Sequence, residues 1–171
     1  MIIRMAEQRD VGAIAAIYGH HAVHGLGTFE EDAPGEMEMA RRMNEVLDKG
    51  LPYLVAEDED AVLGFAYAAP FRPRSAYRFT VEDSVYIAPE AQRRGVGRAL
   101  LTDLIARCEA LDLRQMIAVI GDSDNAGSIG LHASLGFVRE GIGRSLGFKH
   151  GRWVDIVWMQ RPLNDGDRTL P

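Results

Sequence analysis

Hydrophobic positions along the chain alternate between the period of strands and the period of helices. Short apolar runs rich in β-branched and aromatic residues predict strands, and apolar residues three or four positions apart predict amphipathic helices. Strands are therefore expected at Ile2–Met5, Leu51–Glu57, Val62–Ala69, Phe79–Ala88, Gln115–Ile120, Phe137–Leu146 and Trp153–Gln160. Helical spacing follows Asp10 and runs from Met37 to Leu47, from Val96 to Leu111 and from Ala126 to Leu135.

Turn and cap residues mark the ends of these elements. Asp10 is expected to be the N-cap of the first helix, and Gly50 to close the second. The acidic turn Asp58–Asp60 joins two strands into a hairpin, and the proline-containing stretch Phe71–Arg78 is a loop. The last two strands are expected to be joined by GFKHGR, residues 147–152.

The order of these elements predicts a mixed α/β fold in one domain, because strands dominate the middle of the chain with helices between them. A chain of 171 residues has the usual length for a single core. The domain is expected to span residues 1–163, and the polar tail 164–171 is expected to fray.

Composition and charge narrow the class of protein. Hydrophobic residues make up 47% and charged residues 26%, as in soluble globular proteins. No apolar run approaches the roughly 20 residues that span a bilayer, and the N-terminus lacks the features of a secretory signal, so a cytoplasmic location is expected. The net charge of −6 argues against a nucleic-acid-binding or membrane-adsorbed protein.

Cysteine and histidine give little support to a metal site. The single cysteine, Cys108, lies within a predicted amphipathic helix, where packing is the simplest interpretation. His20 and His24 are spaced i, i+4, which could place two imidazoles on one helix face. No companion ligand stands at a suitable spacing, so a surface pair is favoured and no metal is expected.

A basic, glycine-containing turn lies between a predicted strand and the helix that starts near Val96. In the stretch Gln92–Arg98, two glycines let the backbone approach a ligand, and the first N–H groups of the helix have no helical partner. Three arginines add charge-assisted donors for phosphate: Arg93, Arg94 and Arg98. A solvated basic turn is the alternative, and the residues that define dinucleotide and P-loop motifs are absent.

This turn carries a resemblance to a known family. QRRGVG, residues 92–97, resembles the Q/R-x-x-G-x-G/A motif of the GCN5-related N-acetyltransferases (GNAT). Within that family, TVEDSVYI (80–87), AVIGDSDNAGSIGLHASLGF (118–137) and GFKHGRWVDIVWMQR (147–161) resemble the phosphinothricin and methionine sulfoximine acetyltransferases. These segments cover about a third of the chain in the expected order, which makes the resemblance specific.

The resemblance implies a fold and a reaction. The fold is the GNAT fold, with a mixed, mostly antiparallel central sheet of about seven strands and about four helices. The implied reaction transfers acetyl from acetyl-CoA, the co-substrate, to the amino group of a small amine in a ternary complex, without a metal. A homodimer is also implied, since GFKHGRW lies near the subunit contact in relatives of this branch.

The resemblance also assigns residues to the co-substrate. Pantetheine would bind the main chain of the strand at Val85, Tyr86 and Ile87, and the amide of Asn125, which is also expected to cap its helix. The phosphate turn contributes Arg93, Arg94, Gly95, Val96, Gly97 and Arg98, and Ser128 and Ser134 are further candidates.

Two residues are implied in catalysis. Glu82 is placed as the general base, which requires that an apolar site or a nearby carboxylate raise its pKa from about 4.3. Asp83 is adjacent but should point to the other face of the strand. His132 stands where many members have a tyrosine that protonates the departing thiolate. A satisfied strand-end carboxylate and a packed core histidine are the alternatives.

The acceptor amine is expected to be amino-acid-like. Arg72, Arg74 and Tyr77 lie in the loop before the strand of Glu82, and a guanidinium can hold a carboxylate bidentately. Phe29, after the first helix, could cover the apolar part of the substrate. The rival functions are a protein or peptide acetyltransferase of the same fold and a non-catalytic acyl-CoA-binding sensor.

Overall fold

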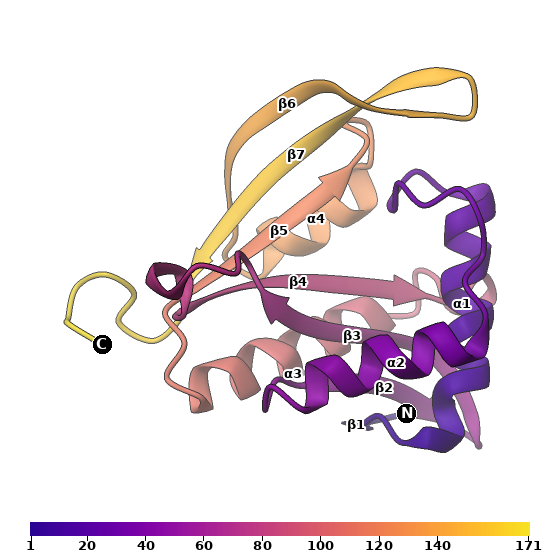
Figure 1. The fold of residues 1–171 in the computed structure, drawn as a ribbon, viewed down its shortest axis with the longest axis horizontal. Coiled ribbons are helices and arrows are strands. Elements are labelled where there is room, and N and C mark those ends of the chain that lie inside the picture. The colour runs from indigo at the N-terminus through magenta and orange to yellow at the C-terminus, as the bar shows by residue number, and fades with distance from the viewer.

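One seven-stranded sheet runs through the whole molecule, and the computed structural model describes residues 1–171 (Figure 1). The strands lie in the order β1-β2-β3-β4-β5-β7-β6, and every neighbouring pair is antiparallel except β4 and β5. Their bounds are Ile2–Met5 (β1), Tyr53–Asp58 (β2), Ala61–Pro70 (β3), Thr80–Ile87 (β4), Gln115–Gly121 (β5), Val138–Lys149 (β6) and Arg152–Pro162 (β7). The expected mixed, mostly antiparallel sheet is confirmed.

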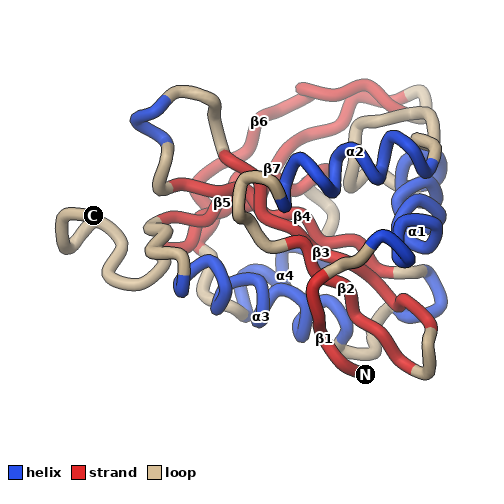
Figure 2. The backbone as a smooth tube through the Cα atoms, turned by 60° about the horizontal axis from the view of Figure 1, so that its bottom comes forward, coloured by secondary structure: helices blue, strands red, loops and turns tan.

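Four α-helices cover the two faces of this sheet (Figure 2). On one face lie α1 (Val11–His24) and α2 (Glu36–Leu47), and on the other lie α3 (Val96–Ala110) and α4 (Ala126–Ser134). Short 3₁₀ turns occur at Gln8–Asp10, Ser75–Tyr77 and Pro89–Ala91. None of the helices has the length and hydrophobicity that crossing a membrane would require.

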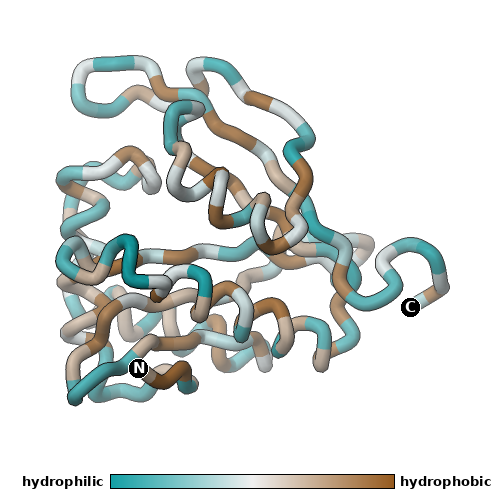
Figure 3. Tube along the Cα trace, turned by 180° about the vertical axis from the view of Figure 1, so that it is seen from behind, coloured by the Kyte–Doolittle hydropathy of each residue, from teal (hydrophilic) through white to brown (hydrophobic).

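The core forms where the apolar stripes of the helices meet the sheet. In α3, Leu100, Leu101 and Leu104 are fully buried, as the helical spacing of apolar residues predicted. Cys108 of the same helix is also fully buried, which confirms its packing role, and burial raises the pKa of its thiol to about 12. Figure 3, seen from the side of α3 and α4, shows hydrophobic and hydrophilic positions alternating along the elements.

The sheet opens into a fork between β4 and β5. These two strands pair in parallel over only four residues each, Thr80–Asp83 with Gln115–Ala118. Beyond that point they diverge, and β5, β7 and β6 turn away from β4 (Figure 1). Asp83 and Ala118 are therefore the last pair at the closed end of the fork.

Both expected helix-end residues stand at the helix ends, but only Gly50 acts as expected. Gly50 has a φ of +71°, and the N–H of Leu51 bonds the carbonyl of Val46, as in a Schellman motif. Asp10 occupies the N-cap position of α1, but its carboxylate accepts bonds from Arg4 at 2.7 Å and from the N–H of Glu7 at 2.7 Å. The side chain therefore joins β1 to the turn before α1 instead of capping the helix.

The last two strands differ from the prediction. β6 continues to Lys149, so only His150 and Gly151 connect it to β7, both with positive φ as a tight hairpin requires. A break in register between Gly143 and Gly147 disturbs the alternation of apolar residues. That irregularity explains why the sequence pattern indicated a strand ending at Leu146 and a longer connection.

The C-terminal tail is anchored, contrary to the expectation that it frays. The guanidinium of Arg114 donates to the carbonyls of Gly166 and Leu170 and to the hydroxyl of Thr169, at 2.8–3.2 Å. Leu163, the residue before this segment, is fully buried. The tail is thus held against the end of the sheet where β5 begins.

We predict that Asp10→Asn lowers the free energy of unfolding by about 2 kcal/mol, because it removes the charge from a buried carboxylate that pairs with Arg4. Burial alone would raise the pKa of Asp10, but the bonds from Arg4 and Glu7 hold it below its usual value. The stabilisation is therefore present above about pH 4 and is lost as pH falls through the folded-state pKa. Denaturant melts of both proteins across pH measure it.

The matched control is Asp103→Asn, which breaks a partly exposed pair with Arg107 on α3. It should cost at most about 0.5 kcal/mol. Equal destabilisation by the two substitutions would show that the Arg4–Asp10 contact has no special weight.

Candidate active site

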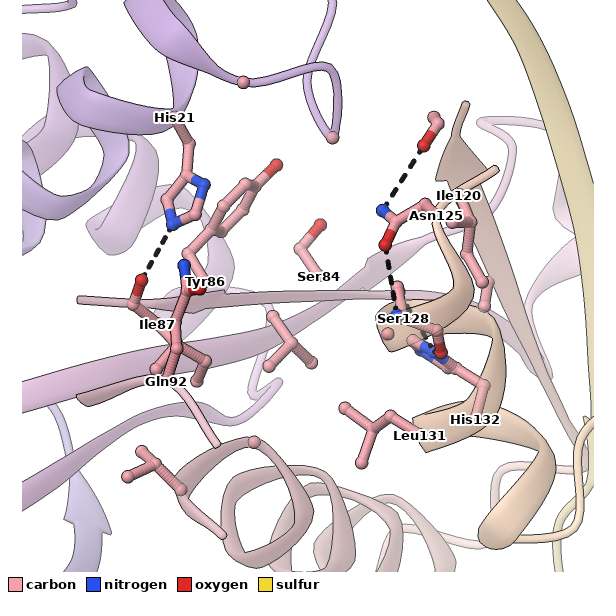
Figure 4. Close-up of a pocket in the computed structure, with 18 of the residues that line it drawn as sticks. His21, Ser84, Tyr86, Ile87, Gln92, Ile120, Asn125, Ser128, Leu131 and His132 are labelled. Carbon is pink, nitrogen blue, oxygen red and sulfur yellow. Dashed lines mark hydrogen bonds between the residues drawn. The ribbon is translucent and has the colours of Figure 1, made fainter. Parts of the chain in front are cut away.

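A cavity of about 560 Å³ fills the fork between β4 and β5 (Figure 4). Its walls come from both strands, the N-terminus of α3, the helix α4 and the loop that follows α1. Of the predicted site residues, it brings together Val85, Tyr86, Ile87, Arg93, Gly95, Val96, Gly97, Arg98, Asn125, Ser128 and His132. The other predicted residues do not line it: Phe29, Arg72, Arg74, Tyr77, Glu82, Arg94 and Ser134.

The basic turn forms one wall of the cavity, and its binding of phosphate stays a prediction. Gly95 adopts a φ of +82°, in the left-handed region that favours glycine. The first bond of α3 runs from the N–H of Ala99 to the carbonyl of Gly95, so the preceding amides in the turn have no helical acceptor. These free N–H groups and the positive end of the helix dipole suit an anionic group such as a phosphate.

The three arginines of the turn do not act alike. Arg93 and Arg98 line the cavity, whereas a guanidinium nitrogen of Arg94 lies 3.9 Å from Asp58 in the β2–β3 hairpin. Arg98 donates to the hydroxyl of Ser134 at 2.8 Å, and that hydroxyl donates to the carbonyl of Leu131. Ser134 is therefore placed to orient Arg98 from outside the cavity.

The exposed edge of β4 forms a second wall. Residues Ser84–Ile87 pair with β3 on one side and with no strand on the other. His21 of α1 lines the same space, and its Nε2 donates to the carbonyl of Ile87 at 2.8 Å (Figure 4). Burial lowers the pKa of His21, with the bond to Ile87 acting against that effect. Sequence reasoning missed His21, although it continues the buried stripe of α1 through Ile14 and Tyr18.

Asn125 begins α4 at the edge of the cavity and caps the helix as predicted. Its side-chain oxygen accepts the N–H of Ser128 at 3.1 Å. Its amide nitrogen lies 3.4 Å from the carbonyl of Gly121 at the end of β5 (Figure 4). The contact of Asn125 with pantetheine stays a prediction.

His132 closes the inner end of the cavity and pairs with a residue that sequence reasoning had set aside. Its Nε2 lies 3.0 Å from Asp83 and its Nδ1 2.8 Å from the carbonyl of Ser128. His132 is only 4% exposed and Asp83 only 6%. Burial lowers the pKa of His132, but the bond and charge of Asp83 and the bond to Ser128 raise it above its usual value overall.

Glu82 faces the side of β4 opposite to Asp83, as the alternation of a strand requires. It lies just before the stretch of β4 that lines the cavity. Burial raises the pKa of Glu82, the charge of Asp83 raises it further, and the charge of Arg72 opposes both. A raised pKa is the condition that the sequence set for a general base, and the catalytic role of Glu82 stays a prediction.

The loop Phe71–Arg78 rims this side of the sheet. Arg72 is exposed and forms no salt bridge, and its guanidinium lies 5.0 Å from the centre of the Phe71 ring. Tyr77 packs edge-on against the same ring at 5.7 Å, and Arg74 is exposed. Among these residues, Arg72 is the one whose charge reaches Glu82.

Comparison with known proteins places this arrangement in a family. Residues 3–158 match the acetyltransferase (GNAT) domain. The chain is 59% identical to the phosphinothricin N-acetyltransferase of Alcaligenes faecalis over 99% of its own length and 86% of the relative's. It is 37% identical to the L-methionine sulfoximine/L-methionine sulfone acetyltransferase of Salmonella typhimurium, covering 96% of each chain.

A solved structure supports the same conclusion. The phosphinothricin acetyltransferase of Sinorhizobium meliloti, crystallised with acetyl-CoA, is 50% identical and superposes with a TM-score of 0.97 over 99% of this chain and 92% of its own. The chain belongs to the GNAT acetyltransferases. It is therefore an acetyl-CoA-dependent N-acetyltransferase, since acetyl-CoA is the co-substrate of this family.

In this GNAT chain, the loop after α1 packs closely against β5 and β6, on the side of the fork opposite β4. A Cβ on Gly121 would overlap the carbonyl oxygen of Leu26, and one on Gly147 would overlap the ring of Phe29. Phe29 therefore rests on the ends of β5 and β6, outside the cavity, while Gly25–Gly27 of the same loop line it. Sequence reasoning missed Gly121, whose requirement arises only from contact with a distant loop.

A buried lysine ties this loop to the hairpin of β6 and β7. Lys149 is 1% exposed, and its ammonium donates to the carbonyl of Thr28 at 2.7 Å. Burial lowers the pKa of Lys149, and the charges of Glu31 and Glu30 act in the opposite direction.

No group of three or more His, Cys, Asp or Glu residues is placed to hold a metal ion in this GNAT chain.

We predict that Gly121→Ala lowers kcat/KM for the amine at least about tenfold, because the added methyl displaces Leu26 and the loop that lines the cavity. Steady-state kinetics with acetyl-CoA and an amino-acid substrate measure the change. The control is Gly130→Ala on α4, where nothing lies within 4 Å of the new Cβ. It should leave kcat/KM unchanged, and wild-type kinetics in Gly121→Ala would contradict the tight contact.

Proposed function

We propose that this acetyltransferase transfers the acetyl group of acetyl-CoA to the amino group of a small amino-acid-like amine, of the phosphinothricin, methionine sulfoximine or methionine sulfone type. The names of its close relatives support this class of substrate. The observation that carries the proposal is the fork, where a phosphate-binding turn and a free strand edge meet next to a glutamate of raised pKa.

The residues of the cavity fit acetyl-CoA. The free amides at the start of α3, with Arg93 and Arg98, suit its pyrophosphate, and the free edge Ser84–Ile87 suits the amides of pantetheine. The side chain of Asn125 stands opposite that edge. When bound, acetyl-CoA supplies the thioester carbonyl that the amine attacks.

Glu82 acts as the general base in this proposal. An amino acid carries an ammonium group near neutral pH, and it must lose a proton before it can attack. A carboxylate of ordinary pKa would be a weak base, but burial and the charge of Asp83 raise the pKa of Glu82 toward the useful range. Glu82 takes this proton directly or through a water molecule.

Arg72 holds the substrate carboxylate. Its guanidinium has no carboxylate partner of its own, lies on the rim and is close enough to influence Glu82. A planar guanidinium holds a carboxylate through two parallel hydrogen bonds, which orients the adjacent amine toward the base. The names of the curated relatives favour a small amine over the rival protein or peptide acceptor, and a similar solved structure from Brucella melitensis, 37% identical, is named a ribosomal-protein-alanine N-acetyltransferase.

We predict that Glu82→Gln lowers kcat by roughly 10²-fold near neutral pH, because the amide cannot accept the proton of the ammonium. In the wild type, kcat/KM should rise with pH through the raised pKa of Glu82, and the variant should lose this limb. Release of free CoA thiol measures the rates. Binding of acetyl-CoA, followed by thermal shift, should be retained.

The control is Glu59→Gln at the exposed tip of the β2–β3 hairpin, which should change neither rate nor binding. Unchanged turnover in Glu82→Gln would remove this glutamate from the mechanism. Stabilisation by NAD or ATP but not by acetyl-CoA would argue against the assigned co-substrate.

We predict that Arg72→Lys raises KM for the amino acid at least roughly tenfold, about 1.4 kcal/mol, and leaves KM for acetyl-CoA nearly unchanged. Lysine keeps the positive charge but cannot form the two parallel hydrogen bonds of a guanidinium. Arg74→Lys, two residues along the same loop, is the matched control and separates loss of a specific contact from loss of a rim arginine. Equal activity on the decarboxylated amine would show that this loop does not bind a carboxylate.

A homodimer through the β6–β7 hairpin completes the proposal. Leu146, Phe148 and Trp153 are 59%, 58% and 64% exposed, and the two aromatic rings pack edge-on at 5.2 Å. Exposed apolar side chains in such a group are typical of an interface.

We predict that light scattering at micromolar protein concentration gives the molar mass of a dimer, and that the variant Trp153→Glu gives the molar mass of a monomer. A monomeric wild-type protein would contradict this part of the proposal.

A further inference from the structure

The closed end of the fork holds a buried pair of ionisable groups that the reaction proposed above does not use. Asp83 is the last residue of β4 that pairs with β5, opposite Ala118. His132 reaches it from α4, the helix that follows β5 in the chain. The pair therefore connects the two sides of the fork at the point where they separate.

The hydrogen bonds of His132 fix how many protons its ring carries. Nδ1 faces the carbonyl of Ser128 at 2.8 Å, and Nε2 faces the carboxylate of Asp83 at 3.0 Å. Carbonyl and ionised carboxylate oxygens only accept hydrogen bonds, and a neutral imidazole has a single N–H. With Asp83 ionised, both contacts form together only when the ring is an imidazolium.

The surroundings of the pair agree with this charge state. Asp83 provides the one opposite charge, from β4, while the ring of Phe137 packs edge-on against His132 at 5.0 Å. Burial, together with the nearby charge of Asp83, raises the pKa of the Cys108 thiol on α3 to about 12, so this thiol is neutral. The second oxygen of Asp83 is buried and has no hydrogen-bond partner, so the carboxylate depends on His132 for its compensation.

These contacts make His132 a poor donor of its proton. Loss of the proton on Nε2 would turn a nitrogen lone pair toward the carboxylate of Asp83, and loss of the proton on Nδ1 would turn one toward the carbonyl of Ser128. The first change breaks a buried hydrogen bond, and the second exchanges the 2.8 Å bond to the Ser128 carbonyl for a longer contact with the Ser128 hydroxyl at 3.4 Å. The leaving thiolate of CoA can instead take its proton from water.

We propose that His132 and Asp83 form a permanent ion pair that fixes α4 against β4 at the fork. Asp83 is the positioning residue of this pair, and His132 does not protonate the leaving thiolate. The pair thereby holds the α4 residues Asn125 and Ser128 at a set distance from the free edge of β4. Only the statement about the thiolate rests on the function proposed above.

The first test reads the protonation of the ring without any enzymatic activity. Nitrogen-15 NMR of the full-length protein, with the His132 signals assigned by their loss in His132→Gln, should show both ring nitrogens protonated at pH 7. The signals should persist unchanged when acetyl-CoA is added. In Asp83→Asn the ring should become neutral at pH 7, because burial then acts without an opposing charge. A neutral ring in the wild type at pH 7 would overturn the proposal.

The second test separates positioning from proton transfer. His132→Gln should lower the melting temperature, because it leaves the charge of Asp83 buried and unpaired, and adding Asp83→Asn should restore part of the loss. The double variant keeps an amide hydrogen bond but has no transferable proton. Its kcat should stay within about fivefold of wild type.

A double variant that folds and binds acetyl-CoA but loses roughly 10²-fold or more in kcat would identify His132 as the proton donor and overturn the proposal. If the double variant does not fold, the NMR result on the wild type decides alone. Failure of the proposed acceptor substrate would leave the ring protonation and the recovery of melting temperature unaffected, so the two proposals can fail independently.

Discussion

The divergence of β4 and β5 is the constraint on which the rest of the molecule depends. A strand that continues past its last paired residue leaves N–H and C=O groups along one edge, and such groups require partners when they are buried. In this chain the edge is Ser84–Ile87, and one of its carbonyls is already bonded by His21. The helix N-terminus, α4 and the loop after α1 all surround this one unpaired stretch of backbone.

Separate braces keep the fork open at a fixed width. At the closed end, Asp83 and His132 join β4 to α4, and at the open end Lys149 joins the last hairpin to the loop after α1. Each brace puts a polar group in the interior, where a missing partner is costly, so the arrangement tolerates little variation. Buried hydrogen bonds thus cross the fork at both of its ends.

Local patterns in the sequence predicted most of the fold and part of the site. The buried leucines of α3 repeat at helical spacing, and the phosphate turn is a motif of adjacent residues, so both could be predicted from the sequence. The contact of His132 with Asp83 spans 49 positions, and that of Lys149 with Thr28 spans 121. The periodicity of apolar residues cannot predict contacts between residues so far apart in the sequence. Asp83 was correctly predicted to face away from Glu82, but the sequence did not show that the other face also borders the cavity.

The burial of Lys149 has a consequence for an enzyme whose work is to acetylate amines. The chain contains two lysines, and Lys149 is enclosed beneath the loop after α1, which leaves Lys49 as the one exposed lysine ammonium. The other basic side chains of the surface are mostly arginines, whose guanidinium groups stay protonated and do not attack thioesters. The protein therefore offers very few nucleophilic amines of its own to acetyl-CoA.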